Sequence, residues 1–208
     1  MTTGMRIGID FDNTIITYDA VFGVIARQRG LVGDGFCGRS KQAIRDHVRL
    51  LPEGEIAWQQ LQGQVYGRGI AGATMFPGVG TFLRRCRAQR LPVVIVSHKT
   101  EYGHYDPERV NLRRAALDWM TAQGFFRDFA LSTENVFFEG TRGEKLRRIA
   151  DLSCTHFIDD LEEVLTDPGF PPGVARILFA NGAGTPAAAP YVVCRSWRAI
   201  EEHIFDHA

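Results

Sequence analysis

Residues 5–14 read MRIGIDFDNT, an apolar stretch that ends in two aspartates, Asp10 and Asp12. The apolar part is typical of a short buried strand, and in an open α/β sheet ligands bind at the carboxyl ends of the strands. Because alternate strand residues point to opposite faces, Asp12 must lie beyond the strand if both carboxylates serve one site. One carboxylate can then act as a nucleophile and the other as a proton donor. The alternative is a pair of strand-end and turn residues that cap a helix.

Short apolar runs alternate with helical patterns along most of the chain, which is typical of βαβ units. We expect strands at Arg6–Asp10, Pro92–Ser97, Asn135–Phe138, His156–Asp159, Ala175–Phe179 and Tyr191–Cys194. The sequence therefore predicts an α/β fold, a Rossmann-like, doubly wound and mainly parallel sheet.

Three helices are expected between these strands. One covers Val79–Gln89, and a second covers Pro107–Ala122, with Asp106 as its N-cap and Pro107 at its first position. A third begins after Thr141, because Glu144 three residues later completes the pattern of a capping box.

Residues 19–73 break the alternation, since they contain helical patterns and no convincing strand. The helical patterns lie at Ala20–Gln28, Lys41–Leu51 and Glu55–Tyr66. We therefore expect a core domain of residues 1–18 and 74–208 and a small helical cap insertion at 19–73. Such an insertion is expected to act as a lid that excludes water and selects the substrate.

A second acidic pair, Asp159 and Asp160, follows the apolar residues His156–Ile158. Two adjacent carboxylates repel each other unless a cation lies between them and the first pair, and hard oxygen ligands suit Mg²⁺. The alternative is that Asp160 only caps the helix that runs through Leu165.

Ser97 and Lys145 complete the set of candidate residues. Ser97 ends the apolar run VVIV at 93–96, where its hydroxyl and the following amides can hold phosphate oxygens, although an ordinary strand-terminating serine is as common. Lys145 stands near the start of a helix, where most lysines are solvated. Beside the carboxylates, however, its charge can offset their repulsion and bind a phosphoryl group.

In this order, and at strand ends, the four motifs resemble those of the haloacid dehalogenase superfamily of hydrolases. The resemblance implies a nucleophile at Asp10 and an acid/base at Asp12. It also implies phosphate contacts from Ser97 and Lys145. Mg²⁺ would bind to Asp10, to Asp12 through its backbone carbonyl, to Asp160, and to Asp159 directly or through water. Members that cleave carbon–halogen bonds lack the second aspartate, so Asp12 implies phosphate ester chemistry.

Residues 97–106 form an unusually polar and aromatic connection after the strand that ends at Ser97. We expect His98 and Lys99 to line a substrate pocket because they adjoin this serine. A solvated surface loop is the alternative for each of them.

The composition narrows the function classes. The chain has 208 residues, of which 45% are apolar, and its 24 basic and 24 acidic residues cancel. No global field draws it to nucleic acid or to a membrane surface, so we expect neither as a partner. The N-terminus lacks the pattern of a signal peptide, and the four cysteines lack metal-site spacing, so we expect free, mostly buried thiols and a cytoplasmic location.

Together these features predict a Mg²⁺-dependent phosphohydrolase. Through the resemblance, it would cleave a small phosphorylated metabolite by way of an aspartyl-phosphate. Two alternatives stay open: a phosphomutase, which would use the same residues, and a catalytically idle regulatory module that only binds metal.

Overall fold

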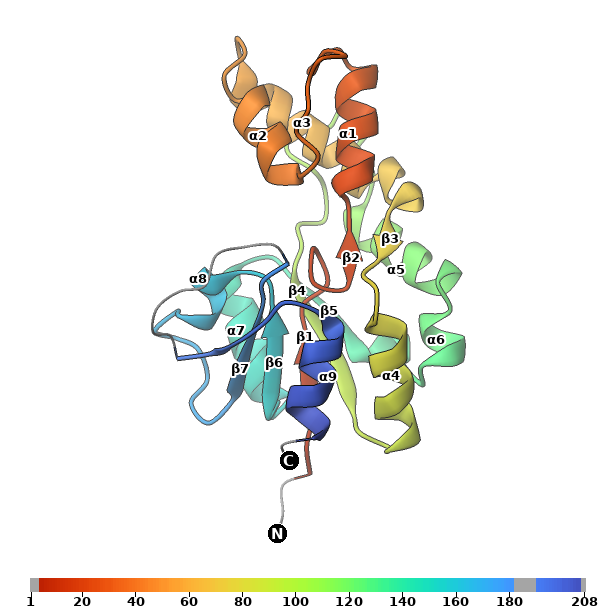
Figure 1. Ribbon diagram of the computed structural model, residues 1–208, viewed down its shortest axis with the longest axis vertical. Coiled ribbons are helices and arrows are strands. Elements are labelled where there is room, and N and C mark those ends of the chain that lie inside the picture. Colours follow the sequence, from red (N-terminus) through yellow and green to blue (C-terminus); the bar gives the residue numbers. More distant parts are fainter. Residues whose placement is uncertain (1–3, 182–189, 207–208) are drawn as a thin grey trace. The chain divides into compact units, whose positions relative to one another are not determined.

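The computed structural model describes residues 4–181 and 190–206 (Figure 1). These residues form two compact units, each described below by itself. The α/β unit comprises residues 4–16, 75–99, 124–181 and 190–206, and the helical unit comprises residues 17–74 and 100–123. The expected core domain also includes residues 1–3, 182–189 and 207–208, which lie outside the described residues.

Six strands of the α/β unit form one sheet in the order β5–β4–β1–β6–β7–β8. They are β1 (Ile7–Ile9), β4 (Val93–His98), β5 (Val136–Glu139), β6 (His156–Asp159), β7 (Ala175–Phe179) and β8 (Val192–Cys194). All neighbouring pairs run parallel. Because β4 and β5 lie on one side of β1 and β6 to β8 lie on the other, the predicted doubly wound α/β fold is confirmed.

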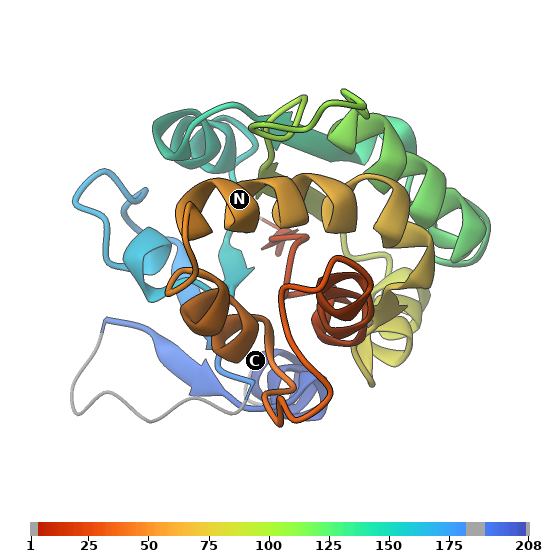
Figure 2. The ribbon, with the colours of Figure 1, turned by 90° about the horizontal axis from the view of Figure 1, so that it is seen from above.

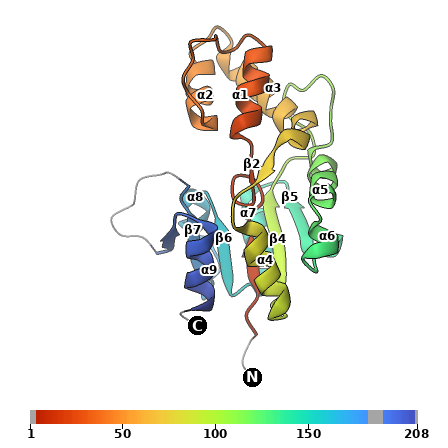
Figure 3. The ribbon, with the colours of Figure 1, turned by 45° about the vertical axis from the view of Figure 1, so that its right-hand side comes forward.

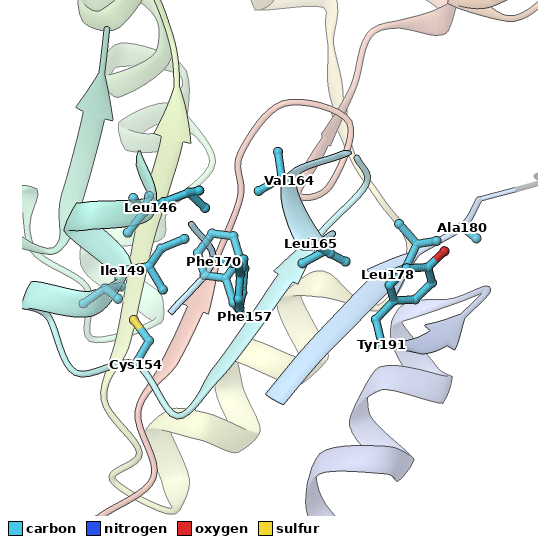
Figure 4. Close-up of a cluster of buried hydrophobic side chains, with 12 residues drawn as sticks. Leu146, Ile149, Cys154, Phe157, Val164, Leu165, Phe170, Leu178, Ala180 and Tyr191 are labelled. Atoms are coloured by element: carbon cyan, nitrogen blue, oxygen red, sulfur yellow. The ribbon is translucent and has the colours of Figure 1, made fainter. Parts of the chain in front are cut away.

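One face of the sheet packs against α7 (Arg142–Asp151) and α8 (Glu162–Leu165). Figure 4 shows Leu146 of α7 and Leu165 of α8 among the buried apolar side chains of this layer, with Phe157 of β6. A Cβ atom at Gly8 of β1 would stand 2.6 Å from the Phe157 ring. Glycine is therefore required in the central strand, where it lets this aromatic ring lie against the backbone.

The opposite face is covered by α4 (Val79–Ala88) and α9 (Trp197–Phe205), which Figure 3 shows on the same side of the sheet. The Trp197 ring lies 5.1 Å from that of Phe82 in α4 and 6.0 Å from that of Phe179 in β7. These aromatic contacts join both helices to the sheet. The shorter elements of this unit are α6 (Phe125–Asp128) and the 3₁₀ helix η2 (Thr133–Asn135).

The helical unit contains α1 (Asp19–Gln28), α2 (Lys41–Val48), α3 (Gly54–Tyr66), the 3₁₀ helix η1 (Arg68–Gly72) and α5 (Leu112–Ala122). The first three pack against one another (Figure 2, red to orange). Phe22 of α1 stacks on Trp58 of α3 at 5.2 Å, so aromatic burial holds this small core together. The three predicted helices of the insertion are confirmed. Two short strands, β2 (Ile16–Thr17) and β3 (Thr74–Met75), pair where the chain enters and leaves the insertion, and the sequence pattern did not predict them.

The helix expected at 107–122 begins five residues later, at Leu112. Its N-cap is Asn111, whose side chain accepts a hydrogen bond from the Arg114 amide. Asp106 is not a helix cap, because its carboxylate accepts from the amides of Glu108 and Val110 and so closes a separate turn.

Residues 100–123 group with the helical unit, whereas the expected boundaries placed them in the core domain. The reason is that α5 packs against α3 and η1. The indole N–H of Trp119 also donates to the Ala73 carbonyl oxygen at 3.0 Å. Whether 19–73 forms an independent domain stays a prediction.

Trp119→Phe is expected to lower the free energy of unfolding by about 1–3 kcal/mol, because it leaves the buried Ala73 carbonyl without its donor. Urea denaturation measures this change. Tyr105→Phe, at an exposed aromatic residue of the same unit, is the matched control and is expected to change stability by less than about 0.5 kcal/mol. Equal effects of the two substitutions would contradict a stabilising role of the hydrogen bond from Trp119 to Ala73.

The cysteines and the helices bear on two expectations drawn from the composition. Cys86, Cys154 and Cys194 are buried free thiols, as expected, whereas the free thiol of Cys37 is exposed. Within the described residues, no helix combines the length and the apolar character needed to cross a bilayer.

Candidate active site

Asp10 follows directly after β1, and its amide donates to the Ile158 carbonyl of β6 at 2.9 Å. This hydrogen bond continues the strand pairing by one residue and holds the Asp10 backbone at the carboxyl end of the central strand. Asp12 lies past the strand, as expected, because the chain turns at Asn13, which has a φ of 58°. The amide of Ile15 closes the turn by donating to the Phe11 carbonyl at 3.0 Å.

Thr14 ties this loop to the second acidic pair. Its hydroxyl donates to Asp160 Oδ1 at 3.3 Å, and its carbonyl accepts from the indole of Trp197 at 2.9 Å. Thr14 is fully buried. Thr14 was not among the predicted site residues, although its position two residues after Asp12 was a usable signal.

Lys145 lies between the two acidic strand ends. The N-cap Thr141, whose hydroxyl accepts from the Glu144 amide, starts α7 so that Lys145 falls in its first turns. Lys145 Nζ donates to Asp10 Oδ1 and to Asp159 Oδ2, both at 2.6 Å. The side chain is only 2% exposed, so this lysine is not a solvated helix residue. The predicted convergence of residues 10, 145 and 159 is observed.

Burial dominates the electrostatics of Asp10. It raises the pKa of the Asp10 carboxyl to about 7, with Asp159 and Asp12 acting in the same direction and Lys145 opposing them. Burial alone would lower the pKa of Lys145, but the charges of Asp10 and Asp159 outweigh it and raise the pKa. Lys145 is therefore a permanent cation, and a further cation at Asp10 would favour the ionised carboxylate.

Asp10, Asp159 and Asp160 each offer a carboxylate oxygen, and these oxygens lie within 4.8 Å of one another. Hard oxygen donors of this kind fit Mg²⁺. When all four are ionised, the aspartates at 10, 12, 159 and 160 carry four negative charges, and the two lysines paired with them, Lys99 and Lys145, carry two positive charges. The remaining formal charge of −2 is what a divalent cation balances.

Asp160 is not the cap of the following helix. Helix α8 has Leu161 as its N-cap, and the Leu161 amide donates to Asp159 Oδ1 at 2.9 Å. The alternative interpretation of Asp160 as a helix cap is therefore not supported.

Ser97 is 1% exposed, and its hydroxyl oxygen has no hydrogen-bond partner within the described residues. It lies on β4, two positions beyond Ile95, which is the register partner of Ile9 in β1. Ser97 is therefore level with the residues that follow β1, on the neighbouring strand. A buried hydroxyl without a partner is costly, and a phosphate oxygen would satisfy it.

The two residues expected to line a substrate pocket have different environments. His98 is exposed, and its Nε2 atom lies 3.0 Å from the Gly140 carbonyl oxygen. Lys99 is buried, and its Nζ atom contacts both carboxylate oxygens of Asp12. Their roles toward a substrate stay predictions.

Comparison with solved structures finds the same fold in several proteins. A hydrolase of the haloacid dehalogenase family from Deinococcus radiodurans R1, solved with bound phosphate and sodium, is 14% identical with a TM-score of 0.57, over 99% of this chain and 97% of that one. A predicted phosphoglycolate phosphatase from Haemophilus somnus 129PT is 14% identical with a TM-score of 0.57. The match covers 98% of this chain and 99% of that one. An L-2-haloacid dehalogenase is 18% identical with a TM-score of 0.54. The match covers 97% of this chain and 99% of that one.

No family model matches the sequence, and no curated protein does either. The structural likeness extends over nearly the whole chain, to a predicted phosphatase and to a dehalogenase alike. The chain therefore has the fold of the haloacid dehalogenase-like hydrolases, the superfamily that its four motifs resemble.

Proposed function

We propose that the protein is a Mg²⁺-dependent phosphohydrolase that cleaves a small phosphorylated metabolite. The observation that carries this proposal is the buried Lys145, whose Nζ contacts Asp10 and Asp159 at 2.6 Å each, beside the acidic trio completed by Asp160. Such an arrangement brings a carboxylate nucleophile, a fixed cation and metal ligands together at the carboxyl ends of the parallel strands. Because a dehalogenase has the same fold, the fold alone does not assign the bond that is cleaved. Asp12 favours phosphate ester cleavage, since the dehalogenases of the family lack this second aspartate.

The reaction proceeds in two steps. A carboxylate oxygen of Asp10 attacks phosphorus, the bond to the ester oxygen breaks, and the carboxyl group of Asp12 gives its proton to the leaving alcohol. Water then attacks the phosphorus of the aspartyl-phosphate while Asp12, now a carboxylate, accepts a proton from that water. The bond from phosphorus to Asp10 breaks, which releases inorganic phosphate and restores both aspartates.

Mg²⁺ would be held by Asp10, Asp160 and the backbone carbonyl of Asp12, with Asp159 directly or through water. When bound, it neutralises charge on the phosphoryl group and on the nucleophile. Lys145 supplies a second positive charge, and the hydroxyl of Ser97 donates to a phosphoryl oxygen.

A panel of phosphate monoesters, assayed for released inorganic phosphate with and without Mg²⁺, tests the proposal. At least one ester is expected to be hydrolysed with Mg²⁺, and the rate is expected to fall by about 10²-fold or more when EDTA removes the metal. Free phosphate also separates a phosphohydrolase from a phosphomutase, which returns the group to its product. A chain that binds Mg²⁺ but releases no phosphate from any ester would contradict the proposal.

A further inference from the structure

Lys99 lies at the carboxyl ends of the parallel strands, as the candidate catalytic residues do. Its amide donates to the Glu139 carbonyl at 3.0 Å, which extends the pairing of β4 with β5 by one residue. Side chains alternate along a strand, so Lys99 shares a face with Ser97, and His98 between them points the other way. The burial follows this alternation: Ser97 and Lys99 are 1% and 4% exposed, and His98 is exposed.

The Lys99 ammonium is directed at Asp12. Its Nζ atom lies 3.0 Å from Asp12 Oδ1 and 2.7 Å from Asp12 Oδ2. It also lies 5.7 Å from the ring centroid of Phe11, which is fully buried beside Phe138. A contact to both oxygens fixes the rotation of the carboxylate as well as its position.

Stability alone is a weak reason for a buried lysine at this place. Taking an ammonium group out of water carries a desolvation cost that the attraction to one carboxylate often only offsets. The Asp12 side chain is 19% exposed, so water can solvate it if Lys99 is replaced by an apolar residue. The folding cost of such a replacement is therefore small compared with that of breaking a fully buried pair.

We propose that Lys99 is a positioning residue that orients the carboxylate of Asp12 for the second step, in which the aspartyl-phosphate is hydrolysed. This inference rests on the proposed function. Once Asp12 has given its proton to the leaving alcohol it is a carboxylate. The contact of Lys99 Nζ with both of its oxygens then holds it for the step in which it accepts a proton from the attacking water and the bond between phosphorus and Asp10 breaks. Without Lys99, the carboxylate loses the contact that fixes its rotation, and the attacking water loses its aligned base.

Lys99→Met, assayed with p-nitrophenyl phosphate and Mg²⁺, isolates that step. The nitrophenolate leaving group needs little protonation, so kcat/KM reports phosphoryl transfer to Asp10 and not the later hydrolysis. We expect kcat and KM to fall together by about 10-fold or more, with kcat/KM within about threefold of wild type. A burst of nitrophenolate equal to the enzyme concentration is expected before the slow phase. Lys99→Gln, which keeps a donor without the charge, is expected to show the same pattern.

Two controls accompany these variants. Lys99→Arg keeps the charge and can contact both oxygens, so it is expected to restore kcat to within about fivefold of wild type. Arg198→Met, which removes an exposed cation of α9 in the α/β unit, is expected to change neither kcat nor KM by more than about twofold.

Other outcomes would overturn the inference. A rise in KM at constant kcat would make Lys99 a substrate contact. An equal loss of kcat and kcat/KM, without a burst, would make it a structural residue. Both results leave the proposed function standing, because the wild-type protein still turns over. A wild-type protein that hydrolyses no ester under these conditions would overturn the proposed function and this inference together.

Discussion

Asp10→Asn is expected to abolish turnover, with a loss of roughly four orders of magnitude or more in kcat for the best ester of the panel. The amide is nearly the same size as the carboxylate and its oxygen can still accept the hydrogen bond of Lys145 Nζ, so the fold is retained. What is lost is the nucleophile itself. Steady-state release of inorganic phosphate measures the effect, and thermal unfolding verifies that the variant is folded.

Asp151→Asn is the matched control, because Asp151 is an exposed aspartate at the end of α7 in the same unit. It is expected to leave kcat within about twofold of wild type. An Asp10→Asn variant that keeps most of its activity would show that the nucleophile lies elsewhere.

Lys145→Met is expected to cause the largest loss of stability, about 3–5 kcal/mol at neutral pH. The reason is that it removes the cation shared by two buried carboxylates, which then face each other without compensation. Turnover is expected to be lost as well. Urea denaturation of the variant and of the wild-type protein measures the difference in the free energy of unfolding.

The loss caused by Lys145→Met is expected to depend on pH. Burial raises the pKa of Asp10 to about 7 even though Lys145 opposes this shift, so removing Lys145 raises the pKa further. An acid with a raised pKa in the folded state binds more protons there than in the unfolded state, so stability falls as the pH rises above the unfolded value of 3.8. The variant is therefore expected to be closer to wild type at pH 5 than at pH 8.

Lys41→Met supplies the stability control, since it removes one lysine from the helical unit. It is expected to cost less than about 1 kcal/mol at either pH. A Lys145→Met variant as stable as wild type at pH 8 would mean that the buried carboxylates do not depend on this lysine.

The sheet was predictable because each strand is a short apolar run that stops at polar residues. The segments around Ile7–Ile9 and Val93–Val96 have this form. The observed first and last residues of these two strands each differ from the expected ones by one residue. The convergence of Asp10, Lys145 and Asp159 followed from the parallel topology, which brings the carboxyl ends of neighbouring strands to one edge.

The start of α5 was not predictable from local pattern alone. Asp106 followed by Pro107 has the form of an N-cap and a first helical residue, and the same residues also form a turn. The structure favours the turn because Asp106 accepts from two amides and Arg109 takes a φ of 46°, which a helix does not allow. The residue types at 106 and 107 therefore do not separate a helix start from a turn.

The contact between Lys99 and Asp12 was also beyond local pattern. The two residues are 87 positions apart, and each was expected at the site without a predicted partner. Strand alternation places Lys99 on the face of Ser97, but the turn at Asn13 decides where the Asp12 carboxylate lies. Long-range pairings of this kind follow from loop geometry, which sequence periodicity does not encode.

Acid quenching of the protein during turnover of p-nitrophenyl phosphate with Mg²⁺, followed by peptide mass spectrometry, tests the assignment of the nucleophile most directly. We predict one added phosphoryl group on the peptide that contains Asp10, located on Asp10 by fragmentation and absent from Asp10→Asn. A phosphoryl group on any other residue, or hydrolysis with no phosphorylated peptide in either protein, would contradict the account.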